Sequence, residues 1–162
     1  MRVILSDISD LSLREGDVLK TPDPQKKLHN CIGCYACWVK TPGQCVIKDS
    51  YADMGALLGR SAELIFVSRC TYGGLSPFVQ NVMDRSLPNI SPDFTVRKQE
   101  QHHKLRYDNT IHLSAYFYGA DMTEQERKTA VSLIPAIALN FGAKVKGVSF
   151  FETADEVKEA FA

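Results

Sequence analysis

The sequence has no excess of charge of either sign. Its 162 residues include 19 Lys and Arg and 19 Asp and Glu, so the formal net charge at pH 7 is +0. Nucleic acids and anionic membrane surfaces attract proteins mainly through a surplus of Lys and Arg. The composition therefore argues against both as partners.

Long apolar runs are also missing. The chain contains no stretch of about 18 apolar residues, the length that a membrane-spanning helix needs. Near the N-terminus, Asp7 comes too early for the apolar core of a secretory signal peptide. We therefore expect a cytoplasmic protein.

Signs of disorder are absent as well. Hydrophobic residues make up 44% of the sequence and charged residues 23%, which is ordinary for a folded protein. Domains usually contain roughly 100 to 200 residues. We expect a single domain over residues 1–162, built around one core.

Apolar runs and helix signals alternate in much of the sequence. Strands are predicted at Arg2–Leu5, Leu64–Val67, Thr110–Tyr118 and Val145–Phe151, with a short candidate at 16–20. Helices are predicted over 51–58 with Asp49 and Ser50 as caps, from Ser76 and Pro77 to Arg85, from Thr123 to Phe141, and from Thr153 onward. This order is typical of an α/β protein with a parallel sheet and helices on both of its faces.

One segment has no recognisable period. Residues Leu87–Asn109 contain two prolines and a polar stretch, so we expect an irregular loop there. In parallel sheets, ligands bind at the carboxyl ends of the strands. The loops after Leu5, Val67 and Tyr118 are therefore the expected binding region.

Four of the five cysteines are close together in the sequence: Cys31, Cys34, Cys37 and Cys45. Thiolates at this density are able to bind an iron-sulfur cluster or zinc. The overlapping Cys-x-x-Cys pairs also suit a reversible disulfide. A third alternative is purely structural, because free cysteine is often buried. The residues by themselves leave all three open.

Several motifs occur in a characteristic order. They are Cys31-Ile32-Gly33-Cys34-Tyr35-Ala36-Cys37-Trp38, then Pro42-Gly43-Gln44-Cys45, then the segment from Ser68 to Gly74, and then Met83-Asp84-Arg85. In this order the sequence resembles the flavodoxin-like NAD(P)H-dependent FMN reductase family, most closely its iron-sulfur-flavoprotein-like branch. The resemblance covers about positions 30 to 155.

The resemblance implies a three-layer, doubly wound parallel sheet that binds FMN. Electrons would pass from NAD(P)H through FMN to a small-molecule or quinone-like acceptor, in a homo-oligomer, either a dimer or a tetramer. The flavin would lie against Ser68, Arg69, Cys70, Thr71, Tyr72, Gly73 and Gly74, and against Tyr116, Tyr118 and Gly119 on a second loop. The metal alternative at the four cysteines would correspond to the iron-sulfur cluster of that branch.

The first strand-helix unit departs from the family pattern. Members normally have a Ser- and Gly-rich loop there, which holds the FMN phosphate at a helix N-terminus. Here Ser6 and Ser9 are the candidates for binding the phosphate, whereas Asp7 and Asp10 would repel it. Arg69, which replaces the usual proline of the flavin loop, either holds an anion or forms a surface salt bridge.

Two functions therefore follow from the sequence. The first is an FMN-dependent NAD(P)H oxidoreductase whose first strand-helix unit is truncated or remodelled. The alternative is a flavodoxin-fold protein that has lost FMN and acts as a thiol-redox or interaction module through its cysteines.

Overall fold

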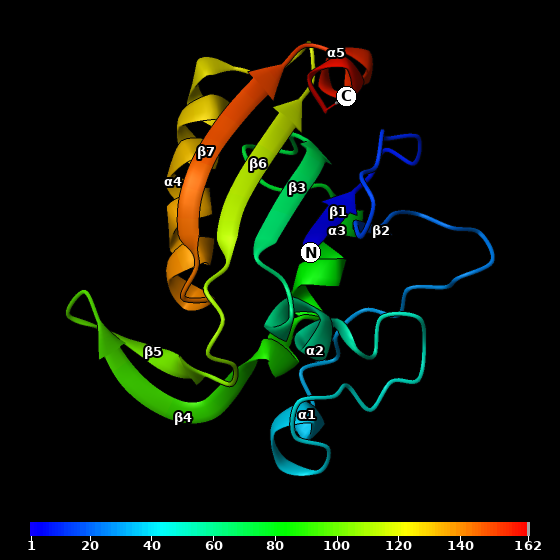
Figure 1. The fold of residues 1–162 in the computed structure, drawn as a ribbon. Coiled ribbons are helices and arrows are strands. Elements are labelled where there is room, and N and C mark those ends of the chain that lie inside the picture. The colour runs from blue at the N-terminus through cyan, green and yellow to red at the C-terminus, as the bar shows by residue number, and fades with distance from the viewer. Residues whose placement is uncertain (162) are drawn as a thin grey trace.

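The computed structural model describes residues 1–161 and is built on a five-stranded parallel sheet (Figure 1). Across the sheet the strands lie in the order β2 (Val18–Lys20), β1 (Arg2–Ser6), β3 (Glu63–Arg69), β6 (His112–Tyr118) and β7 (Lys144–Phe151). All neighbouring strands are parallel. The chain moves outward from β1 to β2 and then returns to β3, so the winding direction reverses at β1 and β3.

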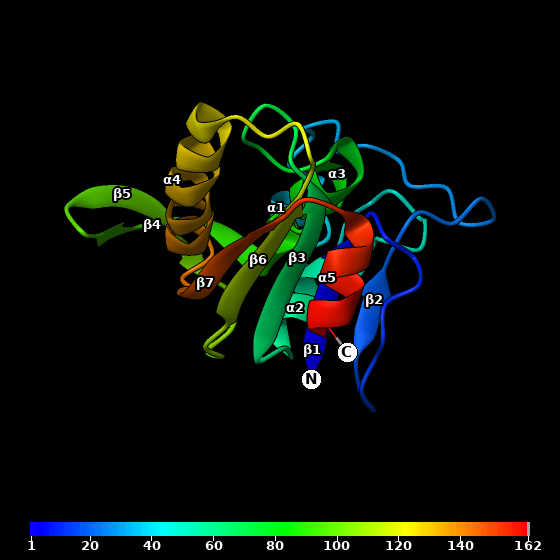
Figure 2. The same ribbon diagram turned by 90° about the horizontal axis from the view of Figure 1, so that it is seen from above.

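Helices lie on both faces of the sheet, as predicted (Figure 2). The helices α2 (Met54–Gly59), α3 (Pro77–Asp84) and α4 (Glu124–Asn140) pack on one face, and α5 (Ala154–Phe161) packs on the other. Phe66 and Phe117 belong to the larger apolar core, which contains the first three helices. Val67 and Phe161 belong to the smaller core under α5. The predicted three-layer architecture is confirmed.

The longest helix begins and ends where the sequence predicts. The Thr123 hydroxyl accepts a hydrogen bond from the Glu126 N–H at 3.2 Å, and the Glu126 carboxylate accepts one from the Thr123 N–H at 2.8 Å. This reciprocal pair satisfies N–H groups that have no partner within the helix. The helix continues through Pro135, and Gly142 follows its end with φ +61°.

The first strand-helix unit is remodelled, in agreement with the sequence. Between β1 and β2, no helix is found in the described part of the chain. Ile8 and Leu11 instead pack into the smaller core, where they contribute to the same cluster as Val157 and Phe161. An extended segment thus covers part of the face that a helix after β1 would cover.

The prediction of an irregular loop over Leu87–Asn109 is wrong. This segment contains a short 3-10 helix, η1 (Leu87–Asn89), and an antiparallel hairpin of β4 (Ile90–Arg97) and β5 (Glu100–Leu105) that projects from the sheet (Figure 1). Its turn consists of Lys98 and Gln99, both at positive φ. Such turns usually contain Gly or Asn. Lys98 and Gln99 are not typical turn residues, and the pairing of the two strands is irregular near Pro92. The sequence pattern therefore does not indicate a hairpin.

Near the cysteines, the structure adds one short helix that the sequence did not predict, and the predicted one begins later than expected. α1 contains only Ala36–Val39, and α2 begins at Met54 instead of Tyr51. Asp49 does not cap α2. It accepts the Tyr51 N–H at 2.9 Å and forms an ion pair with Arg85 at the end of α3. The predicted cap residue is thus part of a tertiary contact.

The Arg85 guanidinium connects the cysteine-rich segment to α3. The whole residue is 1% exposed. Nη1 and Nη2 donate to the two carboxylate oxygens of Asp49 at 2.7 and 2.8 Å, and they also donate to the carbonyl oxygens of His29 and Ile47 at 2.6 and 3.2 Å. Burial disfavours the Asp49 anion, but the hydrogen bonds from Arg85, Tyr51 and His29 outweigh it and hold the Asp49 pKa well below its usual range.

We expect Asp49→Asn to destabilise the protein strongly. The amide leaves a buried guanidinium without its counter-charge, which costs about 3–5 kcal/mol. In the unchanged protein the pKa of Asp49 is lower in the folded chain than in the unfolded chain. Its ion pair therefore stabilises the fold at neutral pH, and this contribution falls as the pH drops below about 4. Urea unfolding at pH 7 and pH 3 measures both effects.

The matched control is Asp23→Asn, which removes a carboxylate from an ion pair with Lys26 whose side chain is 63% exposed. Such surface pairs contribute about 1 kcal/mol or less. Equal losses of stability in the two variants would contradict the structural role of the Arg85–Asp49 pair.

Candidate functional site

The carboxyl ends of β1, β3 and β6 meet at one edge of the sheet. The Cys70 N–H donates to the carbonyl oxygen of Tyr118 at 2.9 Å. The Asp7 carboxylate, just after β1, accepts the Arg69 N–H at 2.9 Å and the Tyr118 hydroxyl at 3.0 Å. The three loops that the sequence indicated are therefore neighbours.

Hydrogen bonding fixes the role of the Tyr118 hydroxyl. Burial raises the pKa of Tyr118 far above its usual range, and the negative charge of Asp7 raises it further. The phenol therefore stays protonated and donates to Asp7. This contact links β1 to β6 across β3, so the hydroxyl is engaged within the protein.

The loop from Ser68 to Gly74 is held rigidly at its base. The buried Ser68 hydroxyl donates to the Arg69 carbonyl at 2.9 Å and accepts the Ser76 N–H at 2.7 Å. Thr71 and Gly74 exchange backbone hydrogen bonds of 3.0 and 2.8 Å around a tight turn. The Ser68 side chain thus shapes the loop from beneath.

The tip of this loop displays a tyrosine. Tyr72 has φ +52° and its side chain extends into solvent, with 89% of the residue exposed. Gly73 follows with φ +79°, and a Cβ at this position would lie 2.6 Å from the Thr129 Cβ on α4. Close packing on α4 thus requires glycine here, whether or not a ligand binds.

Three further predicted residues, Arg69, Cys70 and Gly119, lie on these loops. The Arg69 guanidinium lies 3.6 Å from the Asp121 carboxylate, and both side chains are largely exposed, so the salt-bridge alternative applies to this conformation. Burial raises the pKa of the Cys70 thiol. Gly119, at φ +151°, begins the loop after β6.

The segment after β1 does not fit a phosphate group. Ser6 is fully buried, and its hydroxyl donates to the Ile8 carbonyl at 2.7 Å and accepts the Ile8 N–H at 2.9 Å. Ser9 is exposed, but Asp7 and Asp10 flank it, and Lys158 forms an ion pair with Asp10 at 2.8 Å. A dianionic phosphate would gain no helix N-terminus and would meet two carboxylates. The residues after β1 therefore do not fit the phosphate of FMN.

The four clustered cysteines lie near one another outside the sheet. Burial raises the pKa of the Cys37 thiol, and the charges of Cys45, Cys31 and Cys34 raise it further. All five cysteines are free thiols, and Cys31 and Cys34 are exposed. Within residues 1–161, no group of three or more His, Cys, Asp or Glu is placed to hold a metal ion. The structure thus brings the thiols together without arranging them as the predicted metal site.

Sequence reasoning missed two important residues. The sequence predicts for Asp7 only repulsion of a phosphate, whereas its carboxylate bridges Arg69 and Tyr118. It predicts for Arg85 only a place at a helix end in the Met83-Asp84-Arg85 motif, whereas the guanidinium anchors the cysteine-rich segment. No local signal reveals either role, because all the partners are distant in the sequence.

No protein-family model matches the chain, and no curated protein does. Several solved structures are similar. Azoreductase AzrA has a TM-score of 0.57 at 11% identity, covering 98% of this chain and 93% of that one. An FMN-dependent NADH-azoreductase from Bacillus anthracis str. Ames Ancestor in complex with FMN has a TM-score of 0.55 at 9% identity, covering 98% and 95%. Trp repressor binding protein from Bacillus subtilis has a TM-score of 0.55 at 13% identity, covering 98% and 95%.

The chain has a flavodoxin-like fold. At these identities the likeness concerns the fold alone. In this flavodoxin-like sheet, the edge that contains Asp7, Tyr72 and Gly119 lies at the reversal of the strand order, which is where ligands bind in doubly wound sheets. None of the helices in residues 1–161 is long and apolar enough to cross a membrane.

We expect Gly73→Ala to cost about 2 kcal/mol of stability, since the new Cβ would be strained at positive φ and would clash with Thr129. Gly74→Ala is the matched control, because its Cβ would meet only the Thr71 carbonyl at 3.3 Å. We expect its cost to stay below about 1 kcal/mol. Thermal and urea unfolding of both variants test this difference, and a larger loss for Gly74→Ala would contradict it.

Proposed function

We propose that the chain is an NAD(P)H-dependent oxidoreductase that uses a flavin and reduces a small-molecule or quinone-like acceptor. The motif order in the sequence and the flavodoxin-like fold support this function. Two of the similar structures are an azoreductase and an FMN-dependent NADH-azoreductase by name. Each covers almost the whole of this chain.

The exposed Tyr72 is the observation that carries this proposal. With 89% of the residue exposed, Tyr72 presents an uncovered aromatic ring beside the carboxyl end of β3. Tyr72 lies on a turn whose base is fixed by the Thr71–Gly74 hydrogen bonds, so the ring has a rigid support at the ligand-binding edge. Aromatic rings stack well on planar ligands.

The bound flavin would supply the redox chemistry, namely the acceptance and donation of electrons. The protein residues would supply its position. Backbone groups of Ser68–Gly74 and of Gly119 would contact the ring, and Arg69 would present a positive charge at the same edge. We infer that this site holds the flavin through its ring, because the Ser6 hydroxyl and the flanking carboxylates do not favour a phosphate.

We expect FMN and riboflavin to bind with similar affinity, within about threefold. A phosphate held by charge-assisted hydrogen bonds would gain about 1.5–3 kcal/mol from each of them, and this site lacks those partners. Quenching of flavin fluorescence on titration with protein gives both dissociation constants. Oxidation of NADPH with a quinone acceptor, measured with each flavin present, tests the activity.

We expect Tyr72→Ala to weaken flavin binding about tenfold through the loss of stacking. Val39→Ala is the control, because Val39 is 78% exposed on α1 and lies far from the carboxyl ends of the strands. We expect the control to bind flavin as the unchanged protein does. If the protein quenches the fluorescence of neither FMN nor riboflavin and NADPH is not oxidised, the proposed function is wrong.

A second candidate function is thiol redox chemistry. The observation that favours it is that two of the clustered thiols, Cys31 and Cys34, are free and exposed, with two residues between them in a Cys-x-x-Cys pair. Two such thiols are able to form a disulfide with a peroxide as oxidant. The S–S bond forms, the O–O bond of the peroxide breaks, and two protons and two electrons pass to the oxygens.

We expect one equivalent of hydrogen peroxide to lower the number of titratable thiols by two from the five of the reduced chain. Dithiothreitol should restore them. In the control Cys70→Ala, which leaves the cluster intact, the count should also fall by two. A count that stays at five after peroxide excludes this candidate.

A further inference from the structure

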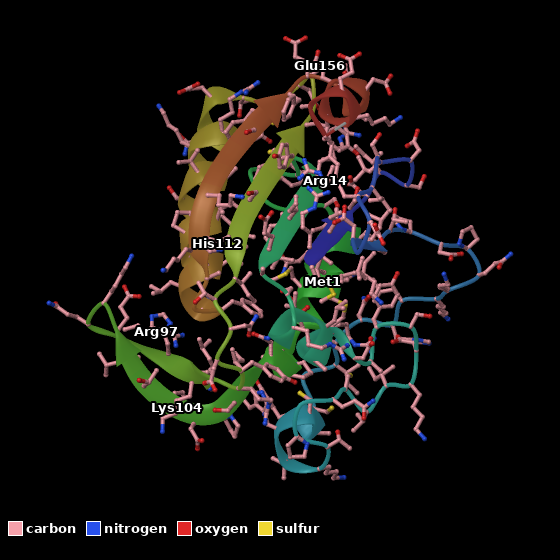
Figure 3. The ribbon with its side chains drawn as sticks, in the orientation of Figure 1. Met1, Arg14, Arg97, Lys104, His112 and Glu156 are labelled. Atoms are coloured by element: carbon pink, nitrogen blue, oxygen red, sulfur yellow. The ribbon has the colours of Figure 1, made fainter. Side chains whose placement is uncertain are left out.

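A cavity of about 760 Å³ opens away from the proposed flavin edge. It lies where the cysteine-rich segment, the β4–β5 hairpin and the ends of α3 and α4 meet. α3 follows the carboxyl end of β3 and runs back along the sheet, so its last residues lie at the amino ends of the strands. Figure 3 shows Lys104 of β5 on this side and Glu156 of α5 at the opposite end. Pockets for small molecules usually measure about 300–1,000 Å³.

Four rings form a continuous series along this cavity. Tyr35 and Trp38 have ring centroids 5.2 Å apart, Trp38 and His103 are 4.6 Å apart, and His103 and Phe94 are 4.6 Å apart. All four residues line the cavity. Tyr35 and Phe94 end the series and remain 54% and 56% exposed. The series therefore presents uncovered aromatic surface to a ligand.

The backbone holds one of these rings in an unusual way. Tyr35 has φ +54°, a conformation that bulky residues rarely adopt and that costs about 1–3 kcal/mol. The Trp38 indole N–H donates to the Leu87 carbonyl at 3.4 Å, which fixes α1 against η1. The aromatic series is thus held in place by tertiary contacts.

Among the cavity-lining residues of the described chain, Asp84 is the only Asp, Glu, Lys or Arg. Gln80 donates to its Oδ1 at 2.8 Å. Within residues 1–161, no Lys, Arg or His lies within salt-bridge distance of Asp84, so its charge is not neutralised by an ion pair. A positively charged group would complement this carboxylate.

We propose that the cavity binds a small planar aromatic molecule that carries a positive charge. The flat ring packs against the series from Tyr35 to Phe94, and the cationic group pairs with Asp84. The carboxylate selects cations over anions of the same shape, and the rings select planar molecules over aliphatic amines. The site is separate from the flavin edge, so this inference does not depend on the proposed function.

Trp38 makes the test direct, because it is the single tryptophan of the sequence and it lines the cavity. The probes are 4-aminoquinoline, which is cationic at pH 7, and quinoline-4-carboxylate, an anion with the same ring system. Emission of Trp38 is recorded during titration with each probe and corrected for absorption by the probe. We expect saturable quenching by 4-aminoquinoline and none by the carboxylate in the same concentration range.

Three variants locate the binding. We expect Phe94→Ala to weaken binding about tenfold by removing a ring, and Asp84→Asn to weaken it about fivefold by removing the charge. Val96→Ala is the matched control, because Val96 is 72% exposed on the same strand as Phe94 but does not line the cavity. We expect it to bind as the unchanged protein does.

Three results would overturn the inference. The first is an absence of saturable quenching by 4-aminoquinoline in the unchanged protein. The second is equal binding of the two probes that Asp84→Asn does not alter. The third is a Trp38 emission that changes with protein concentration in the absence of a probe, because the cavity would then be an interface between two copies of this chain. All three leave the flavin measurements unaffected.

Discussion

The ion pair between Arg85 and Asp49 is the contact on which the placement of the cysteine-rich segment depends. Arg85 is almost fully buried, so its charge is tolerable only with the Asp49 carboxylate and the carbonyl oxygens of His29 and Ile47 around it. These partners lie on both sides of the cysteine-rich segment in the sequence. One buried side chain at the end of α3 therefore determines where the four clustered thiols and α1 lie.

The segment after β1 is the second constraint. A helix at this place would offer N–H groups to an anion at its N-terminus. Here the chain instead packs Ile8 and Leu11 under α5, and the Ser6 hydroxyl is used to fix the turn. This packing completes the smaller core, and the segment after β1 therefore offers no helix N-terminus to an anion. The loops after β3 and β6 are unaffected, because their geometry depends on Ser68, Asp7 and Tyr118.

The two candidate binding regions therefore lie at opposite ends of the same sheet. At the carboxyl ends, the exposed Tyr72 stands on a rigid turn beside Arg69 and Gly119. At the amino ends, the β4–β5 hairpin and the cysteine-rich segment enclose an aromatic cavity with one unneutralised carboxylate. α3 and α4 each run from one region to the other, so opposite ends of these helices contribute to the two regions. The two regions share no lining residue. A ligand at one end makes no contact with the other.

The sequence by itself determined the sheet, the order of its helices and the edge at which the loops of β1, β3 and β6 gather. The apolar run Leu64–Val67 and the Thr123–Glu126 cap depend only on residues close together in the sequence, and both form in the structure as predicted. Tertiary structure decided the rest. The hairpin turn at Lys98 and Gln99 has no local signal, and the partners of Asp7 and Arg85 come from distant segments. Which polar groups remain available to a ligand is known only after the fold has paired the others, because each buried donor or acceptor must find its partner wherever the chain brings one.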